Sequence, residues 1–113
     1  MEIKIKGCYQ DRTVFINGKE LSPGRSQKLR NHSPDGFAWG YGGSGPAQLA
    51  LAILLEITKD KQFALKNYQD FKWDIICDLP MEEDFTLEEK IVSTWIAKRL
   101  IRNISMTGTV KGQ

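Results

Sequence analysis

Residues 47–57 constrain the fold most, because this segment is apolar on every face of a helix. Only Gln48 and Glu56 interrupt it. A helix without a polar face must be covered on all sides by the rest of the chain. The 113 residues of the chain suffice for one domain with a core of its own, so the remaining segments must enclose this helix.

Three short segments before this helix predict an antiparallel sheet. Residues 2–9 alternate apolar and polar side chains, and residues 13–16 are β-branched and aromatic. Residues 19–21 then follow the pair Asn17-Gly18. An Asn-Gly pair is typical of a two-residue hairpin turn, since both turn residues must take positive φ. Residues 22–35 show no periodicity and are predicted to form a loop.

The second half of the chain predicts two further helices. Apolar residues at helical spacing indicate a helix over 62–79, although 73–79 fits a strand as well, and Trp73 and Trp95 are assigned to the core. Residues 86–89 match a capping box that starts a helix running to about Arg102. The expected fold class is α+β. A small N-terminal hairpin or antiparallel sheet packs on the buried central helix together with two further helices.

Composition narrows the class of protein. Residues 1–102 are expected to form a single domain, and the polar residues 103–113 a flexible tail. The net charge of +2 is too small to favour nucleic acid as a partner. Cys8 and Cys77 are expected as reduced thiols, without a metal or cofactor. The longest apolar run, residues 49–55, is too short to span a bilayer, so we expect a cytoplasmic protein without a membrane partner.

A glycine- and aromatic-rich segment, residues 36–48, enters the central helix. Phe37, Trp39 and Tyr41 alternate, which predicts an extended segment with three aromatic rings on one side. Ser44 or Gly45 is the expected N-cap. Unpaired N–H groups and the helix dipole make such a helix start a cradle for anions.

These features predict a ligand site at the helix start. Basic residues that precede the segment balance an anion, glycines admit it to the backbone, and the aromatic rings stack on a planar group. The candidate ligand-binding residues are Arg25, Arg30, His32, Trp39, Tyr41, Gly42, Gly43, Ser44, Gly45 and Gln48. The segment lacks the residues of a phosphate loop or a dinucleotide fingerprint.

Other interpretations of the segment stay open. The glycines fit a tight entry into a buried helix, with the aromatic residues packed over the core. The same aromatic residues, if exposed, suit a surface through which this protein binds a host protein. A homodimer is a further hypothesis. A hydrolase would have to use His32 with Asp35 and either Ser33 or Ser44, and no catalytic residue is predicted.

The segment 32–55, HSPDGFAWGYGGSGPAQLALAILL, resembles a domain-of-unknown-function family of small proteins from bacteria, their phages and mobile elements. The hairpin at 15–21, YQDFK at 68–72 and Trp95-Ile96 resemble it more loosely. The resemblance implies an accessory or anti-defence role and supplies no catalytic residues. Our leading hypothesis is a non-enzymatic module that captures a small anionic or nucleotide-derived ligand, such as an immune signal.

Overall fold

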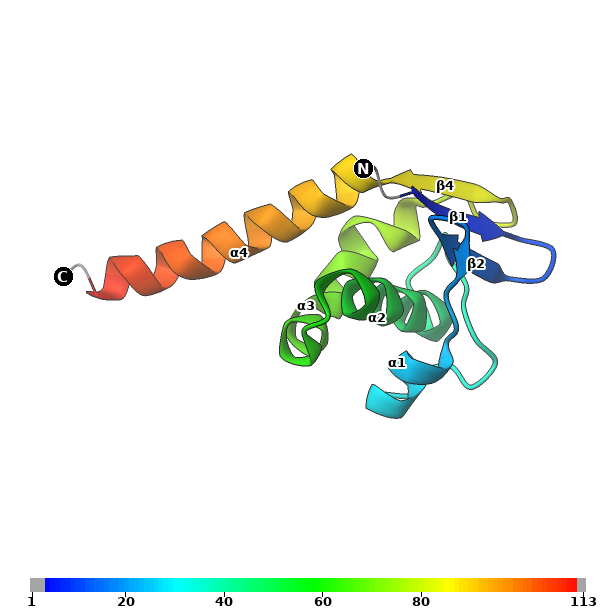
Figure 1. Ribbon diagram of the computed structural model, residues 1–113, viewed down its shortest axis with the longest axis horizontal. Coiled ribbons are helices and arrows are strands. Elements are labelled where there is room, and N and C mark those ends of the chain that lie inside the picture. Colours follow the sequence, from blue (N-terminus) through cyan, green and yellow to red (C-terminus); the bar gives the residue numbers. More distant parts are fainter. Residues whose placement is uncertain (1–3, 112–113) are drawn as a thin grey trace.

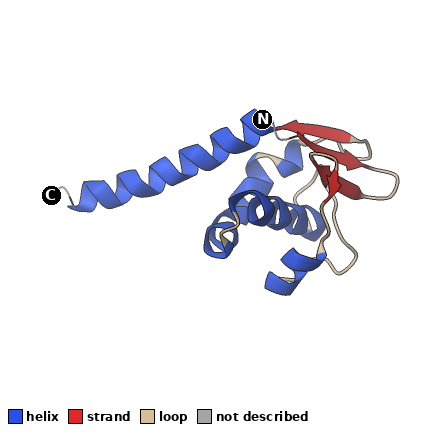
Figure 2. Ribbon diagram, viewed as in Figure 1, coloured by secondary structure: helices blue, strands red, loops and turns tan. Residues whose placement is uncertain are grey.

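The sheet and the helices of this protein lie on opposite sides of a shared core (Figures 1 and 2). The structure, a computed structural model, describes the backbone of residues 4–111 and the side chains of residues 4–102. Its elements, in chain order, are β1 (Lys4–Cys8), β2 (Thr13–Ile16), β3 (Lys19–Glu20), α1 (Gly24–Leu29), α2 (Ser44–Thr58), α3 (Lys61–Asp74), the 3-10 turn η1 (Ile76–Asp78), β4 (Phe85–Glu88) and α4 (Glu89–Lys111). The predicted α+β class is confirmed.

The sheet is antiparallel, with strand order β3-β2-β1-β4. The predicted hairpin turn is confirmed, since φ is +53° at Asn17 and +81° at Gly18. The side chain of Asn17 also accepts a hydrogen bond from the backbone N–H of Lys4, which ties the turn to β1. Glu2 and Ile3, which we expected in the first strand, lie outside the described residues.

The capping box predicted at residues 86–89 is wrong, because this segment forms most of strand β4. Phe85 and Leu87 are buried while Thr86 and Glu88 are exposed, the alternation of a strand with one wet face. Leu87 pairs with Ile5 of β1 in the sheet. Pairing with an existing strand therefore decides the structure here, and the helix α4 begins only at Glu89.

Helix α2 occupies the centre of the protein, as predicted. Residues 45–55 are all buried, and they belong to one core with the inner face of the sheet and with α3. The N-cap is Gly43, so the expectation of Ser44 or Gly45 at this position is wrong by one or two residues. At the far end, Lys59 closes α2 in the left-handed conformation, and its N–H donates to the Leu55 carbonyl.

Two helical segments differ from their predictions. Residues 24–29 form the short helix α1 inside segment 22–35, which we predicted to be a loop. A helix of six residues is too short to show an apolar repeat in the sequence. The Ser26 hydroxyl donates to the Pro23 carbonyl at 2.9 Å. The helix predicted over 62–79 is interrupted after Asp74, and η1 follows, so residues 73–79 do not form a strand.

Helix α4 starts beside the sheet and contacts α3 through Trp95 and Arg99, and its C-terminal part extends away from the other helices (Figure 1). Its backbone stays helical to Lys111, past Arg102 where we expected it to end. The flexibility of residues 103–113 stays a prediction, and residues 112–113 lie outside the described backbone. None of the described helices combines the length and the hydropathy that a membrane span requires.

Candidate functional site

The backbone before α2 is shaped by two glycines whose neighbours leave no room for a side chain. Gly40 has a φ of +87°, and a Cβ atom there would lie 2.6 Å from the Met81 Cα. A Cβ atom at Gly45 would lie 2.7 Å from the Ala38 Cβ. Both glycines are therefore required by packing alone, which supports the structural interpretation for this part of the segment.

The two glycines between them, Gly42 and Gly43, lie against exposed aromatic rings. A Cβ atom on Gly42 would lie 2.3 Å from the Trp73 ring, and one on Gly43 would lie 2.4 Å from the Tyr41 ring. Trp73 is 57% exposed and Tyr41 is 46% exposed. Two rings from distant parts of the chain thus flank the backbone that leads into α2, and each keeps about half of its surface open to solvent.

Lys72 places a positive charge beside Gly42 and the Trp73 ring. The residue is only 7% exposed, and its Nζ donates to the Gly42 carbonyl at 3.2 Å. The same ammonium lies 4.3 Å from the Trp73 ring centroid, a cation–π contact. No carboxylate among the described residues forms an ion pair with it. We call Tyr41, Gly42, Gly43, Ser44, Lys72 and Trp73 the α2-start site.

His32 contacts α3, the helix that carries Lys72 of the α2-start site. Tyr68 and Lys72 lie one turn apart on that helix, and the Tyr68 hydroxyl is 2.5 Å from His32 Nε2. Burial lowers the pKa of His32 below its ordinary value, and the charges of Arg30 and Lys72 lower it further. The neutral imidazole is therefore favoured, and the positive field that disfavours its proton is the field that would attract an anion.

This pKa direction predicts how stability depends on pH. The pKa of His32 is lowered from 6.5, so the unfolded chain binds the proton more readily than the folded one. The associated stability is complete above pH 6.5 and is lost as the pH falls through 6.5 toward the lower folded-state pKa.

We expect the urea midpoint of the wild type to fall more between pH 7.5 and 5.5 than that of His32→Asn. Both proteins share every other titrating group, so the difference between the two slopes isolates His32. Parallel loss of stability in the two proteins over this pH range would show that the imidazole does not resist protonation.

Gln48 is placed where it cannot reach a ligand. It is fully buried, and its Oε1 accepts from the backbone N–H groups of His32 at 2.7 Å and Ser33 at 3.0 Å. Its Nε2 donates to the Ser26 hydroxyl at 2.9 Å and to the Arg30 carbonyl at 3.1 Å. Gln48 therefore joins α2 to α1 and to the segment after it.

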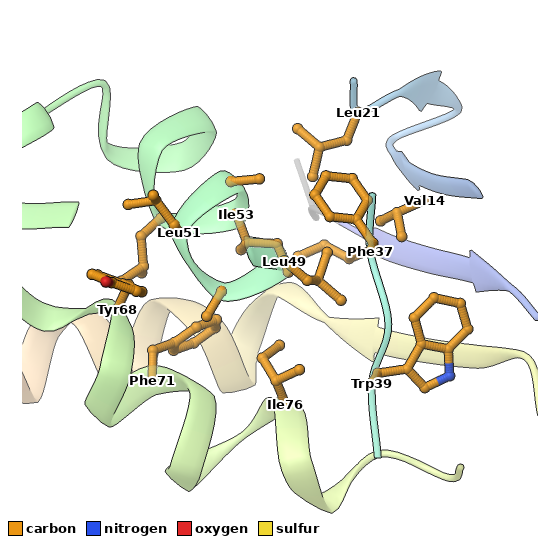
Figure 3. Packing of buried hydrophobic residues seen from close by; sticks show 14 of the residues in the cluster. Val14, Leu21, Phe37, Trp39, Leu49, Leu51, Ile53, Tyr68, Phe71 and Ile76 are labelled. Carbon is orange, nitrogen blue, oxygen red and sulfur yellow. The ribbon is translucent and has the colours of Figure 1, made fainter. Parts of the chain in front are cut away.

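Trp39 also belongs to the interior rather than to a binding face. Phe37 and Trp39 are 5% and 3% exposed and lie among the buried side chains around Leu49 (Figure 3). The Trp39 indole N–H donates to the Glu83 carbonyl at 2.9 Å, and its ring meets the Phe85 ring edge-on at 4.8 Å. The prediction of three aromatic rings on one side is wrong, since only Tyr41 faces solvent.

The predicted basic residues separate in space. The Arg25 guanidinium lies 3.6 Å from Glu56, near the C-terminal end of α2 and far along the helix from Ser44. Arg30 has an exposed side chain, and its charge acts on His32. The described hydrogen bonds join His32 to Tyr68 and to Gln48, and they do not join it to Ser44. Among the described residues, no group of three His, Cys, Asp or Glu side chains could hold a metal ion.

Sequence reasoning missed Lys72 and assigned Trp73 to the core. The helical stripe of Ala64, Tyr68 and Phe71 carried the necessary signal. Lys72 lies four residues after Tyr68 and therefore shares its face, whereas Trp73 lies two residues after Phe71 and points away from the core. The period of the helix alone therefore places Lys72 on the inner face of α3 and Trp73 on its outer face.

Comparison with known proteins agrees with the resemblance at the level of the family. A family model described as "Family of unknown function (DUF6166)" matches residues 6–98. The matched range includes the α2-start site and both helices that build it. Neither the curated proteins nor the solved structures give a match to this chain. Because the family model covers more than half of the sequence, the chain belongs to the family of unknown function DUF6166.

Proposed function

We propose that this protein is a non-enzymatic binding module that captures a small anionic, nucleotide-derived ligand at the α2-start site. The observation that carries the proposal is the ammonium of Lys72, a residue that is only 7% exposed, which a backbone carbonyl holds and no described carboxylate neutralises. Buried charges in proteins are normally paired, because an unpaired one loses its hydration without compensation. A bound anion would supply the missing partner.

The start of α2, two residues after Gly42, adds backbone donors. The first internal hydrogen bond of the helix runs from the Ala47 N–H to the Gly43 carbonyl. The N–H groups of Ser44 and Gly45 precede that bond and have no acceptor within the helix, and Pro46 has no N–H to offer. Ser44 is exposed and contributes a hydroxyl as well. A phosphate or carboxylate oxygen suits this arrangement.

The exposed rings of Tyr41 and Trp73 suit the planar part of such a ligand. Bases stack on aromatic side chains with little dependence on sequence, and each stacked base contributes about 1–3 kcal/mol. A nucleotide carries both chemistries in one molecule, an anion for Lys72 and the helix start and a flat ring for the aromatic pair. The α2-start site therefore favours a nucleotide over inorganic phosphate alone.

The resemblance of residues 32–55 to proteins of bacteria, phages and mobile elements supports a biological setting for this binding. In that setting the ligand is a nucleotide signal of host immunity, and the protein lowers its free concentration by binding it without turnover. A binding module of this kind needs no general base. This agrees with an imidazole at His32 that is committed to Tyr68.

Thermal unfolding against a panel of nucleotides tests the proposal. A ligand at one hundred times its Kd stabilises the native state by about 2.7 kcal/mol, which raises the Tm of a domain this size by roughly 10 °C. The panel contains nucleoside mono- and diphosphates, cyclic mononucleotides and cyclic dinucleotides. Adenosine and pyrophosphate are the controls, each presenting one half of the chemistry. We expect a shift from at least one nucleotide that exceeds the shifts from both controls.

Substitution of the exposed rings identifies the site. Trp73→Ser and Tyr41→Ser are expected to weaken nucleotide binding by about tenfold each, in line with the loss of one stacking partner. Trp39 is unsuitable for this test because it is buried in the core. No shift from any nucleotide, or an unchanged shift in both serine variants, would remove the proposal.

Met81 favours a second candidate function, the binding and blocking of a host protein. Its side chain is 55% exposed, and its backbone packs against Gly40 beside the exposed Tyr41. Tyr, Trp and Met are enriched at the centres of protein interfaces. Purification of one stoichiometric host partner, lost in both Met81→Lys and Tyr41→Ser, would favour this function. Nucleotide binding that survives Met81→Lys would favour the first.

A further inference from the structure

A cavity of about 470 Å³ lies at the opposite end of α2 from the α2-start site. The hairpin of β2 and β3, the helix α1 and the second half of α2 line it, and it is open to solvent on one side. Ser44 and Lys59 mark the two ends of α2, which are about 20 Å apart at 1.5 Å per residue. The volume falls within the range of roughly 300–1,000 Å³ that small-molecule sites occupy.

The cavity has an apolar floor. Leu21 from the hairpin side and Ala52 and Leu55 from α2 line it, and all three are buried members of the core. Ile16 of β2, which is partly buried, closes the floor beside them. A ligand that enters the cavity would therefore rest on hydrocarbon, and the parts of it in contact with the floor are expected to be apolar.

The rim of the cavity is charged and predominantly basic. Lys19, Arg25 and Lys59 face two carboxylates, Glu20 and Glu56. Lys59 holds Glu56 at 2.8 Å, whereas Arg25 lies 3.6 Å from it, too far for a hydrogen bond. The Arg25 side chain is 71% exposed. Its guanidinium can therefore turn to a second carboxylate without breaking a hydrogen bond.

The C-terminal end of α2 does not prevent an anion from binding here. The negative end of a helix dipole arises from carbonyl groups that lack partners. In α2 the Leu54 carbonyl accepts from the Thr58 hydroxyl at 2.7 Å, and the Leu55 carbonyl accepts from the Lys59 N–H at 2.9 Å. The second bond satisfies one of the four terminal carbonyl groups of α2, and the cations Lys19, Arg25 and Lys59 beside the cavity offset the negative charge of the others.

We propose that this cavity is a second binding site, which takes a small organic carboxylate with an apolar body. The Arg25 guanidinium holds the carboxylate in a two-point contact, Lys19 adds positive charge, and the apolar body lies against Leu21 and Leu55. The site shares no residue with the α2-start site, so either can fail without the other.

Titration of ¹⁵N-labelled protein with 3-phenylpropionate tests the proposal. We expect amide resonances of residues 16–26 and 52–59 to move, while those of Gly43 and Ser44 stay in place. The amine analogue 3-phenylpropylamine has the same body and the opposite charge. It is expected to bind about tenfold more weakly, since the rim offers three cations against two carboxylates.

Arg25→Gln is expected to weaken 3-phenylpropionate binding by about tenfold, as for the loss of a charge-assisted contact. Lys28→Gln is the matched control, because Lys28 is an exposed cation of α1 that does not line the cavity. This variant is expected to bind 3-phenylpropionate as tightly as the wild type. The proposal is overturned if no resonance near the cavity moves, if the amine binds as tightly as the acid, or if both variants bind alike.

Discussion

Replacing Gln48 by leucine is expected to lower the free energy of unfolding by about 3–5 kcal/mol. The substitution keeps the approximate volume but removes four hydrogen bonds in a site that is fully buried. It leaves the backbone N–H groups of His32 and Ser33 and the carbonyl of Arg30 without their partner. Each unsatisfied buried group costs about 1–3 kcal/mol, a large share of the roughly 5–15 kcal/mol that stabilises a domain.

Urea denaturation followed by circular dichroism measures this loss. Gln69→Leu is the matched control, since Gln69 is an exposed glutamine on α3, and its effect is expected to stay within about 0.5 kcal/mol. If Gln48→Leu unfolded with the same urea midpoint as the wild type, Gln48 would not hold the segment 30–33 in place.

Lys72→Met is expected to separate binding from stability. Methionine fills the space of the lysine side chain but carries no charge that loses its hydration when the chain folds. The free protein should therefore unfold at the same urea concentration or at a higher one, by up to about 1–2 kcal/mol in unfolding free energy. Nucleotide binding should weaken by about 10- to 100-fold, since a hydrogen bond to a charged group contributes about 1.5–3 kcal/mol.

Isothermal titration with the nucleotide that gives the largest thermal shift measures the binding loss. Lys66→Met removes an exposed lysine from the same helix and should leave both affinity and stability near the wild type. A destabilisation above about 2 kcal/mol in Lys72→Met with unchanged affinity would mean that the ammonium serves the fold through Gly42 and Trp73.

Much of the fold follows from local patterns. The hairpin turn at Asn17-Gly18 requires positive φ at both positions, and the buried helix 47–57 has no polar face to expose. These features depend on backbone conformation and on the burial of one element, which the sequence carries directly. They place the sheet, the central helix and the segment that leads into it.

The parts that sequence reasoning misplaced depend on distant partners. Residues 86–89 satisfy a capping box and a strand equally well, and pairing of Leu87 with Ile5 decides between the two. Gln48 and Trp39 have the chemistry of ligand-binding residues. However, Gln48 is hydrogen-bonded to Ser26 and His32, and the Trp39 indole N–H is hydrogen-bonded to Glu83. No local pattern reveals that such partners lie within reach.

The candidate site shows the same division. Ser44, Tyr41 and the glycines come from one continuous segment that the sequence identifies. Lys72 and Trp73 come from α3, and packing of α3 against α2 brings them beside Gly42. Arg25 is only 19 positions before Ser44 in the chain, yet the turn after β3 places it beside Glu56 at the other end of α2.

The most direct test of the central claim locates the bound anion on the protein. ¹⁵N-labelled wild-type protein and Lys72→Met are titrated with the nucleotide that gives the largest thermal shift, and amide resonances are followed. We predict the largest changes at Gly43, Ser44 and Gly45 of the wild type, with movement of the Trp73 indole resonance, and their loss in Lys72→Met. Changes centred on other residues, or equal changes in both proteins, would contradict an anion site at the start of α2.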